Sequence, residues 1–265
     1  MTRNYKEQIM TDTLRIKKIK SIIIIIFAII SCGFIILAGL IYNGIVLMNN
    51  PSSNSYPVRG IDVSTYQGDI DWETLVANDI SFAFIKATEG SSLIDPHFAF
   101  NFEKAQKCGI AIGAYHFFSY DSSAETQAKL FIDTVSPFDG MLPPVIDLEF
   151  YGNYEKEPPS REYVDKELGI MLDMIEDHYG LKPIIYATEK SYELYLSNAY
   201  SEYDIWIRDV YFNPILSDGR EWTFWQYTNR ERFDGYNGKE KYIDVNVFNG
   251  SSEDFKNYPK YLSHN

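Results

Sequence analysis

The chain has 265 residues, enough for one domain of barrel or doubly wound size once any targeting segment is set aside. Its formal charge is −13, but residues 1–20 carry +4, so the rest of the chain carries −17. An acidic body argues against nucleic acid as a partner, since phosphate binding needs a basic surface. Two cysteines, Cys32 and Cys108, lie in very different surroundings and offer no disulfide framework.

The N-terminal region is typical of a membrane anchor. Residues 21–48 contain no charged side chain, and Ile22 to Tyr42 alone could cross a hydrocarbon core of about 30 Å. The basic arm 1–20 before it predicts a single-pass protein of the cell membrane, with a cytoplasmic N-terminus and the remainder outside.

Two other interpretations of this region are weaker. A cleaved signal peptide would have a shorter apolar region, of about 7 to 15 residues, and a small-x-small site at its end. Ile29-Ile30-Ser31-Cys32 resembles a bacterial lipoprotein cleavage box, but the residues after Cys32 stay strongly apolar. We therefore expect a retained anchor at 21–48.

Turn-forming residues then predict a short linker at 49–57, which fully extended would reach only about 30 Å. From Val58 to Gly250, short apolar runs alternate with amphipathic stretches, and a short polar tail follows at 251–265. The eight runs predict strands at Gly60–Ser64, Phe82–Thr88, Ala111–Phe117, Pro144–Glu149, Pro183–Thr188, Asp204–Val210, Thr223–Thr228 and Tyr242–Phe248.

Helical periodicity fills the earlier gaps between these runs and is missing from the later ones. The predicted helices lie at about Asp71–Asn78, Pro96–Cys108, Ala124–Val135, Arg161–His178 and Lys190–Ser197. Five strand-helix units followed by three strands predict an α/β fold, an irregular TIM-like barrel preceded by one transmembrane helix.

Acidic residues mark three of the predicted strands. Asp147 and Glu149 are two residues apart, so a strand would place them on one face, and Asp62 and Asp244 lie in the first and last runs. Crowding raises the pKa of carboxyl groups, which suits the acid catalysis of glycoside hydrolysis. Each acid taken singly could instead cap a neighbouring helix.

Other chemistries find less support. The four histidines show no metal-binding spacing, and neither a G-x-S-x-G elbow nor a phosphate-binding G-x-x-x-x-G-K-[ST] loop occurs. We therefore expect no metal and no cofactor.

Several short motifs together resemble one known family. They are Arg59-Gly60-Ile61-Asp62-Val63-Ser64, Tyr66-Gln67-Gly68, Ile70-Asp71-Trp72, Phe84 to Gly90, Gly113 to Phe117, Pro143 to Glu149, Pro183 to Tyr186, Trp206-Ile207, Trp225-Gln226-Tyr227 and Asp244-Val245-Asn246. Over about Val58 to Gly250 the chain looks like the family 25 glycoside hydrolases, the Chalaropsis-type lysozymes. The resemblance implies an irregular barrel that cuts the β-1,4 bond between N-acetylmuramic acid and N-acetylglucosamine.

The resemblance also implies roles for the four acids. Glu149 would be the general acid, and Asp147 would hold the substrate's 2-acetamido group, which acts as internal nucleophile with net retention. Asp62 and Asp244 would complete an acidic floor. Carboxyls at i and i+2 of a strand are roughly 6 to 7 Å apart, which by itself points toward inversion, so retention rests on the resemblance.

Side chains at or near the predicted strand ends could line a sugar groove. The candidates are Tyr66, Lys86, Tyr115, Tyr186, Trp206, Trp225 and Gln226. The alternative for each aromatic residue is core packing, and for Lys86 a structural salt bridge.

The sequence thus predicts a membrane-anchored enzyme acting on peptidoglycan glycan strands, with unknown protein partners. Two alternatives stay open. One is a non-catalytic barrel that binds wall glycan or a partner protein, and the other is a hydrolase of a different N-acetylated glycan such as chitin.

Overall fold

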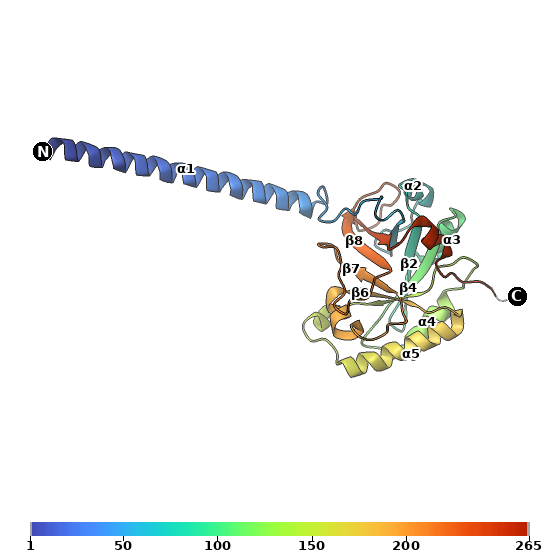
Figure 1. Cartoon of the computed structure of the whole chain (residues 1–265). Helices are drawn as coiled ribbons and strands as arrows, with labels where there is room; N and C mark the ends of the chain where they lie inside the picture. Colours follow the sequence, from blue (N-terminus) through green and yellow to red (C-terminus); the bar gives the residue numbers. More distant parts are fainter. Residues whose placement is uncertain (1, 264–265) are drawn as a thin grey trace. The chain divides into compact units, whose positions relative to one another are not determined.

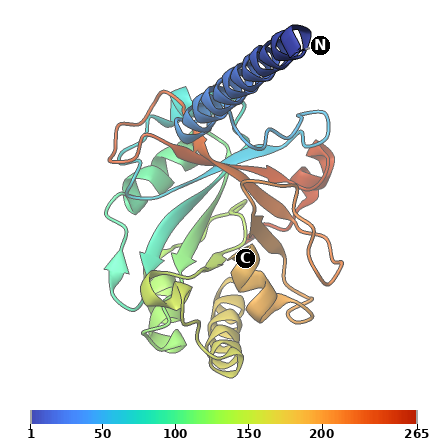
Figure 2. The same ribbon diagram turned by 90° about the vertical axis from the view of Figure 1, so that its left-hand side faces the viewer.

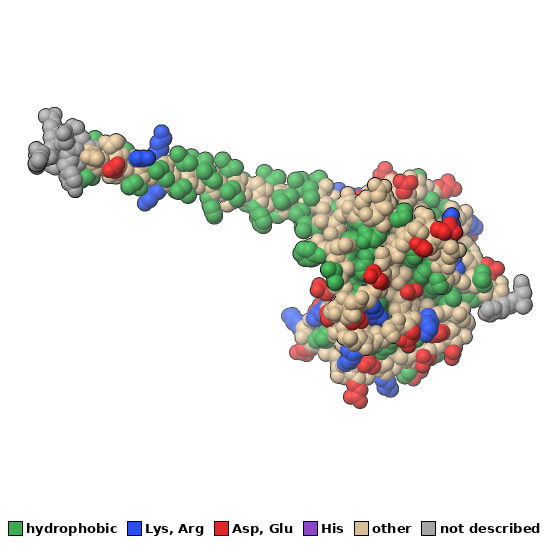
Figure 3. All heavy atoms as spheres, in the orientation of Figure 1, with side chains coloured by type: hydrophobic (Ala, Val, Ile, Leu, Met, Phe, Trp, Pro, Cys, Tyr) green, Lys and Arg blue, Asp and Glu red, His purple; other side chains and the backbone are tan. Residues whose placement is uncertain are grey.

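The computed structural model describes residues 2–263 and, for side chains, residues 8–263. The chain divides into two units, one ending at Leu47 and the other starting at Met48. The first unit is helix α1, Thr2–Tyr42, which begins earlier than the predicted anchor. Its segment Gln8–Tyr42 is long and apolar enough to cross a membrane, although a signal sequence meets the same criterion. Hydrophobic side chains cover most of this helix (Figure 3).

The second unit is built on a closed barrel (Figures 1 and 2). Its strands run in the order β1-β9-β8-β7-β6-β5-β4-β2, and a pairing between β1 and β2 closes the ring. They are β1 Arg59–Val63, β2 Phe82–Glu89, β4 Ala111–Phe117, β5 Val145–Leu148, β6 Ile184–Thr188, β7 Ile205–Arg208, β8 Phe224–Glu231 and β9 Ile243–Phe248. The irregular barrel is thus confirmed, and each predicted run overlaps one barrel strand. β1 begins one residue before its predicted run, β2 ends one residue after its run, and β8 continues three residues beyond its run.

One barrel strand differs from the others in direction. β9 is antiparallel to both of its neighbours, β1 and β8, whereas the other barrel pairings are parallel. The start of β9 therefore lies at the mouth where the parallel strands end, and Asp244 pairs in register with Asp62. In a parallel barrel the site residues come from the carboxyl ends of the strands, but Asp244 reaches this mouth from the beginning of an antiparallel strand.

The helices pack outside the strands (Figures 1 and 2). They are α2 Trp72–Val76, α3 Phe98–Lys107, α4 Ala124–Thr134, α5 Arg161–Tyr179 and α6 Glu189–Ser191, which continues as the π-turn η2 Tyr192–Leu196. The 3₁₀ turn η1, Gly152–Glu155, and the two-residue strand β3, Leu93–Ile94, were not expected. The longest of these helices, α5, begins where Ser160 caps the backbone N–H of Tyr163 and ends at Gly180 with a φ of 65°.

Aromatic side chains fill the barrel interior toward the amino ends of the parallel strands. Phe82, Phe84 and Phe224 are completely buried there, with ring centroids 5.2 to 5.7 Å apart. Gly60 and Gly113 make room for them, because an added Cβ would lie 2.4 Å from the Phe82 ring or 2.8 Å from the Phe84 ring.

The segment predicted as a polar tail contributes to the same end of the barrel. Helix α7, Ser252–Asn257, buries Phe255 against Phe82 and Phe248, at centroid distances of 5.5 and 5.2 Å. The packed domain therefore continues beyond Gly250.

Candidate active site

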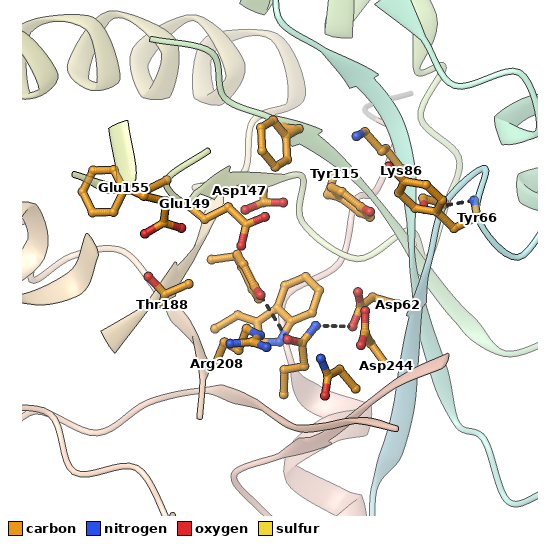
Figure 4. A pocket seen from close by; sticks show the side chains of 17 residues that line it. Asp62, Tyr66, Lys86, Tyr115, Asp147, Glu149, Glu155, Thr188, Arg208 and Asp244 are labelled. Atoms are coloured by element: carbon orange, nitrogen blue, oxygen red, sulfur yellow. Dashed lines mark hydrogen bonds between the residues drawn. The ribbon is translucent and has the colours of Figure 1, made fainter. Parts of the chain in front are cut away.

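A cavity of about 490 Å³ opens at the mouth where the parallel strands end (Figure 4). Every barrel strand contributes to its wall, because alternate residues of each strand point inward. The four predicted acids line it, together with Ser64, Tyr66, Lys86, Tyr115, Phe117, Phe150, Glu155, Tyr186, Thr188, Trp206, Arg208, Gln226 and Asn229.

Asp147 and Glu149 come from the end of β5. Asp147 is 7% exposed, and Glu149 follows the strand in a half-buried position. Burial raises the pKa of Glu149 to about 7, although the positive charge of Arg208 opposes the shift. Burial and the negative charge of Glu149 raise the pKa of Asp147 well above its ordinary value. At neutral pH this part of the site therefore holds a proton.

One oxygen of Asp147 stands out. Its Oδ1 is buried and has no hydrogen-bond partner among the described residues. Since buried polar atoms are nearly always paired, this oxygen is available to a donor on a bound molecule.

Asp62 is held by two amides on neighbouring strands. Its Oδ2 accepts hydrogen bonds from Gln226 Nε2 at 2.9 Å and from Asn246 Nδ2 at 2.8 Å. Trp206 Nε1, which can only donate, donates to Asn246 Oδ1 at 2.8 Å and so fixes which way that amide faces. Burial raises the pKa of Asp62 to about 6 despite the two amides, which favour its charged form.

Asp244 pairs in register with Asp62 on the neighbouring strand, and the two carboxyl groups lie side by side (Figure 4). Burial and the charge of Asp62 raise the pKa of Asp244 well above its ordinary value. The four acids thus bring fewer than four negative charges to the cavity.

Comparisons with known proteins identify the family of this chain. The model of the glycosyl hydrolases family 25 matches residues 61–236. The chain belongs to glycosyl hydrolase family 25. A family 25 enzyme structure from Bacillus anthracis is 54% identical, with a TM-score of 0.76 over 80% of this chain and 97% of that one. Lysozyme M1 of Streptomyces globisporus is 30% identical over 211 residues, 74% of this chain and 69% of that protein.

YegX of Escherichia coli K12 is 40% identical over 207 residues, 76% of this chain and 73% of that protein. These relationships make the protein a glycosidase of the lysozyme, or muramidase, type. Within the described residues, no three His, Cys, Asp or Glu side chains are arranged to hold a metal ion.

Six of the seven side chains predicted to line the sugar groove border the cavity of this family 25 enzyme. Tyr66 is 58% exposed at the rim, whereas Tyr115, Tyr186, Trp206 and Gln226 are buried in the wall. The Tyr186 hydroxyl donates to Gln226 Oε1 at 3.0 Å, so it orients that amide toward Asp62.

Lys86 is the sixth of these side chains, and it also forms the salt bridge that was the structural alternative for it. Its Nζ donates to Glu89 Oε2 at 2.6 Å and lies 4.8 Å from the centre of the Phe117 ring. Its positive charge nevertheless lowers the pKa of both Asp147 and Glu149 against the larger effect of burial.

The structure does not bring Trp225 to the cavity. Trp225 is 3% exposed and packs outside the barrel, where its Nε1 donates to the carbonyl of Asp209 at 2.8 Å. It precedes Gln226 on β8, and consecutive strand residues point to opposite faces. Only one of these two neighbours can face the sugar.

Sequence reasoning missed Arg208 and the role of Asn246. Arg208 ends β7 and lines the cavity, where its positive charge lowers the pKa of Asp62, Glu149 and Asp244. The sequence feature that could have identified Arg208 is a charged residue near the end of an apolar run. Asn246 is completely buried two residues after Asp244, a spacing that places both on the inner face.

Proposed function

We propose that this glycosidase is a single-pass protein of the bacterial cell membrane that cleaves the β-1,4 bond between N-acetylmuramic acid and N-acetylglucosamine in peptidoglycan. Its N-terminus would be cytoplasmic and its barrel outside. The apolar helix after a basic arm supports the orientation. Relatives named lysozyme and N,O-diacetylmuramidase support the substrate.

Glu149 acts as the general acid, and its raised pKa is the observation that carries the proposal. A carboxyl with a pKa of about 7 is still protonated near neutral pH and can give its proton to the leaving glycosidic oxygen. Turnover should therefore fall as the pH rises through about 7, which a pH-rate profile measures.

Asp147 orients the substrate's 2-acetamido group. Its unpaired Oδ1 accepts the acetamido N–H, which favours the ionised form of Asp147. The acetamido carbonyl oxygen then attacks the anomeric carbon while the leaving oxygen takes the proton of Glu149. Water later opens the cyclic intermediate, with Glu149 now acting as the base, and the configuration is retained.

Asp62 supplies negative charge opposite the positive charge that develops at the anomeric centre, and Asp244 lies beside it. Because Asp62 is held by two amides, its carboxylate needs no reorientation during the reaction. The sugar rings would lie against Tyr66, Tyr115, Tyr186 and Trp206, whose apolar faces suit the apolar faces of pyranoses.

Digestion of purified peptidoglycan by the full-length protein in detergent tests the substrate. We expect new reducing ends of N-acetylmuramic acid. New reducing ends of N-acetylglucosamine would show that another bond is cut, and no release by the folded wild-type protein would contradict the proposal. Sequencing of the membrane-bound protein tests the anchor, because a mature N-terminus between Cys32 and Tyr56 would mean that the helix is removed.

A further inference from the structure

The loop between β7 and β8 carries exposed apolar side chains. Residues 210–216, here called the apolar loop, contain no charged side chain. Phe212 is 72% exposed, Ile215 92% and Tyr211 60%. Exposed apolar residues gathered in one place indicate a surface that meets an apolar partner.

The apolar loop has a fixed conformation. The Asp209 carboxylate accepts the backbone N–H groups of Tyr211 and Phe212 at 2.9 and 2.8 Å, which engages the nearest charge at the start of the loop. Pro214 and Leu216 point inward and are buried, and the Pro214 carbonyl accepts Trp222 Nε1 at 3.3 Å. Phe212 and Ile215 are thus held outward by a folded loop.

The first residue of the linker, Asn49, is hydrogen-bonded to this loop and to the residue before it. The side-chain amide of Asn49 donates to the carbonyls of Asp209 and Phe212, at 3.2 and 3.3 Å. At the other end of the linker, Tyr56 packs on Trp222 and Trp225, with centroids 5.7 and 6.0 Å away. The predicted linker is therefore held against the barrel at both ends.

Chain connectivity identifies the partner. The helix that could span the membrane ends at Tyr42, and six uncharged residues, 43–48, connect it to Asn49, whose amide holds the loop. Since the seven steps from Tyr42 to Asn49 span at most about 25 Å, a bilayer that contains the helix keeps its surface within this reach of the apolar loop. A protein partner would have to enter between the two.

We propose that the apolar loop inserts into the outer surface of the bilayer, with Phe212 and Ile215 among the lipid chains and Tyr211 at the headgroups. This rests on the proposed membrane anchor. Aromatic and aliphatic residues at this depth are typical of interfacial contacts, and with no basic side chain in the loop the contact depends little on lipid charge. Arg208 lines the cavity immediately before the loop, so the active site would open close to the membrane, on glycan next to it.

Fluorescence quenching in vesicles tests the insertion. Full-length Phe212→Trp and Ile215→Trp proteins are reconstituted in phosphatidylcholine vesicles with or without brominated acyl chains. The native tryptophans are all buried, so subtracting the wild-type signal isolates the new residue. We expect brominated lipid to reduce its emission about twofold or more, as for a side chain 5–10 Å into the interface. Quenching lipid in both leaflets makes the result independent of protein orientation.

Phe100→Trp is the matched control, because Phe100 is 40% exposed on α3, away from the β7–β8 loop. Its emission should be unaffected by brominated lipid. If the protein floats with vesicles after an alkaline wash but positions 212 and 215 behave like position 100, the loop insertion is wrong and the anchor stands. If the protein does not float, the proposed anchor is wrong, and the proposed loop insertion, which depends on the anchor, is wrong as well. Muramidase activity is unaffected by either result.

Discussion

The two ends of the barrel interior contrast sharply, although the same strands build both. At one end Phe82, Phe84 and Phe224 form a dry aromatic plug, whereas at the other Asp62, Asp147, Glu149 and Asp244 surround a cavity. On β9 the change occurs within one strand, since Asp244, Asn246 and Phe248 occupy successive inward positions.

The comparison shows how a barrel supports a group of acids that would by themselves destabilise it. The plug excludes water from below, which raises the pKa values of the carboxyls above it. The plug's packing offsets the cost of burying the acids. Substitutions of the acids should therefore mainly lower turnover, and substitutions in the plug should mainly lower the free energy of unfolding.

Glu149→Gln is expected to have the largest effect. The amide cannot donate a proton to the leaving oxygen, so release of reducing ends should fall by about 10³-fold while the fold is kept. Exposed Glu162 on α5 gives the control Glu162→Gln, which should be fully active. Less than a tenfold loss in Glu149→Gln would remove this residue from the acid role.

Asp147→Asn should lower turnover by about 10²-fold, because the variant amide oxygen still accepts the acetamido N–H but without the charge that polarises it. The loss should lie mainly in kcat and little in KM. A variant that loses only affinity would indicate that Asp147 binds the sugar without assisting its acetamido group.

Gly60→Ala tests the plug. The new Cβ would lie 2.4 Å from the Phe82 ring, so unfolding in denaturant should show a loss of about 2 kcal/mol with little change in kcat per folded molecule. Gly169→Ala on α5 has no neighbour within 4 Å and should instead be neutral or stabilise by up to about 1 kcal/mol. Equal effects of the two substitutions would contradict the close packing of the plug.

The smallest expected effect is a pH dependence of stability. The pKa of Glu149 is about 7 in the folded protein and 4.5 as its ordinary value, so the folded state is the one that holds the proton between these values. Wild-type stability should fall over that window, and Glu149→Gln should be the more stable protein at pH 8 by about 1–2 kcal/mol. Denaturant unfolding at pH 4.5 and pH 8 measures this. An equal difference in stability between the two proteins at both pH values would show that burial does not destabilise the charged form of Glu149.

The sequence determined much of the fold because hydrophobic patterning is local. Eight apolar runs predicted the eight barrel strands, and Ser160 and Gly180 bounded α5 by cap chemistry that depends on a few adjacent residues. The spacing of Asp147 and Glu149 likewise placed them together. The tail lacked such a pattern, and only Phe255 under the barrel reveals that it belongs to the domain.

Tertiary structure decided the rest, because strand direction and the choice of inner or outer face depend on neighbours distant in sequence. Alternation on β8 leaves either Trp225 or Gln226 facing the cavity, and the register of β8 with β9 selects Gln226. The antiparallel course of β9 brings Asp244 to Asp62, and closure of the ring adds Arg208 and Asn246. The sequence supplied the acids, and only the closed barrel brought them together with their hydrogen-bond and charge partners.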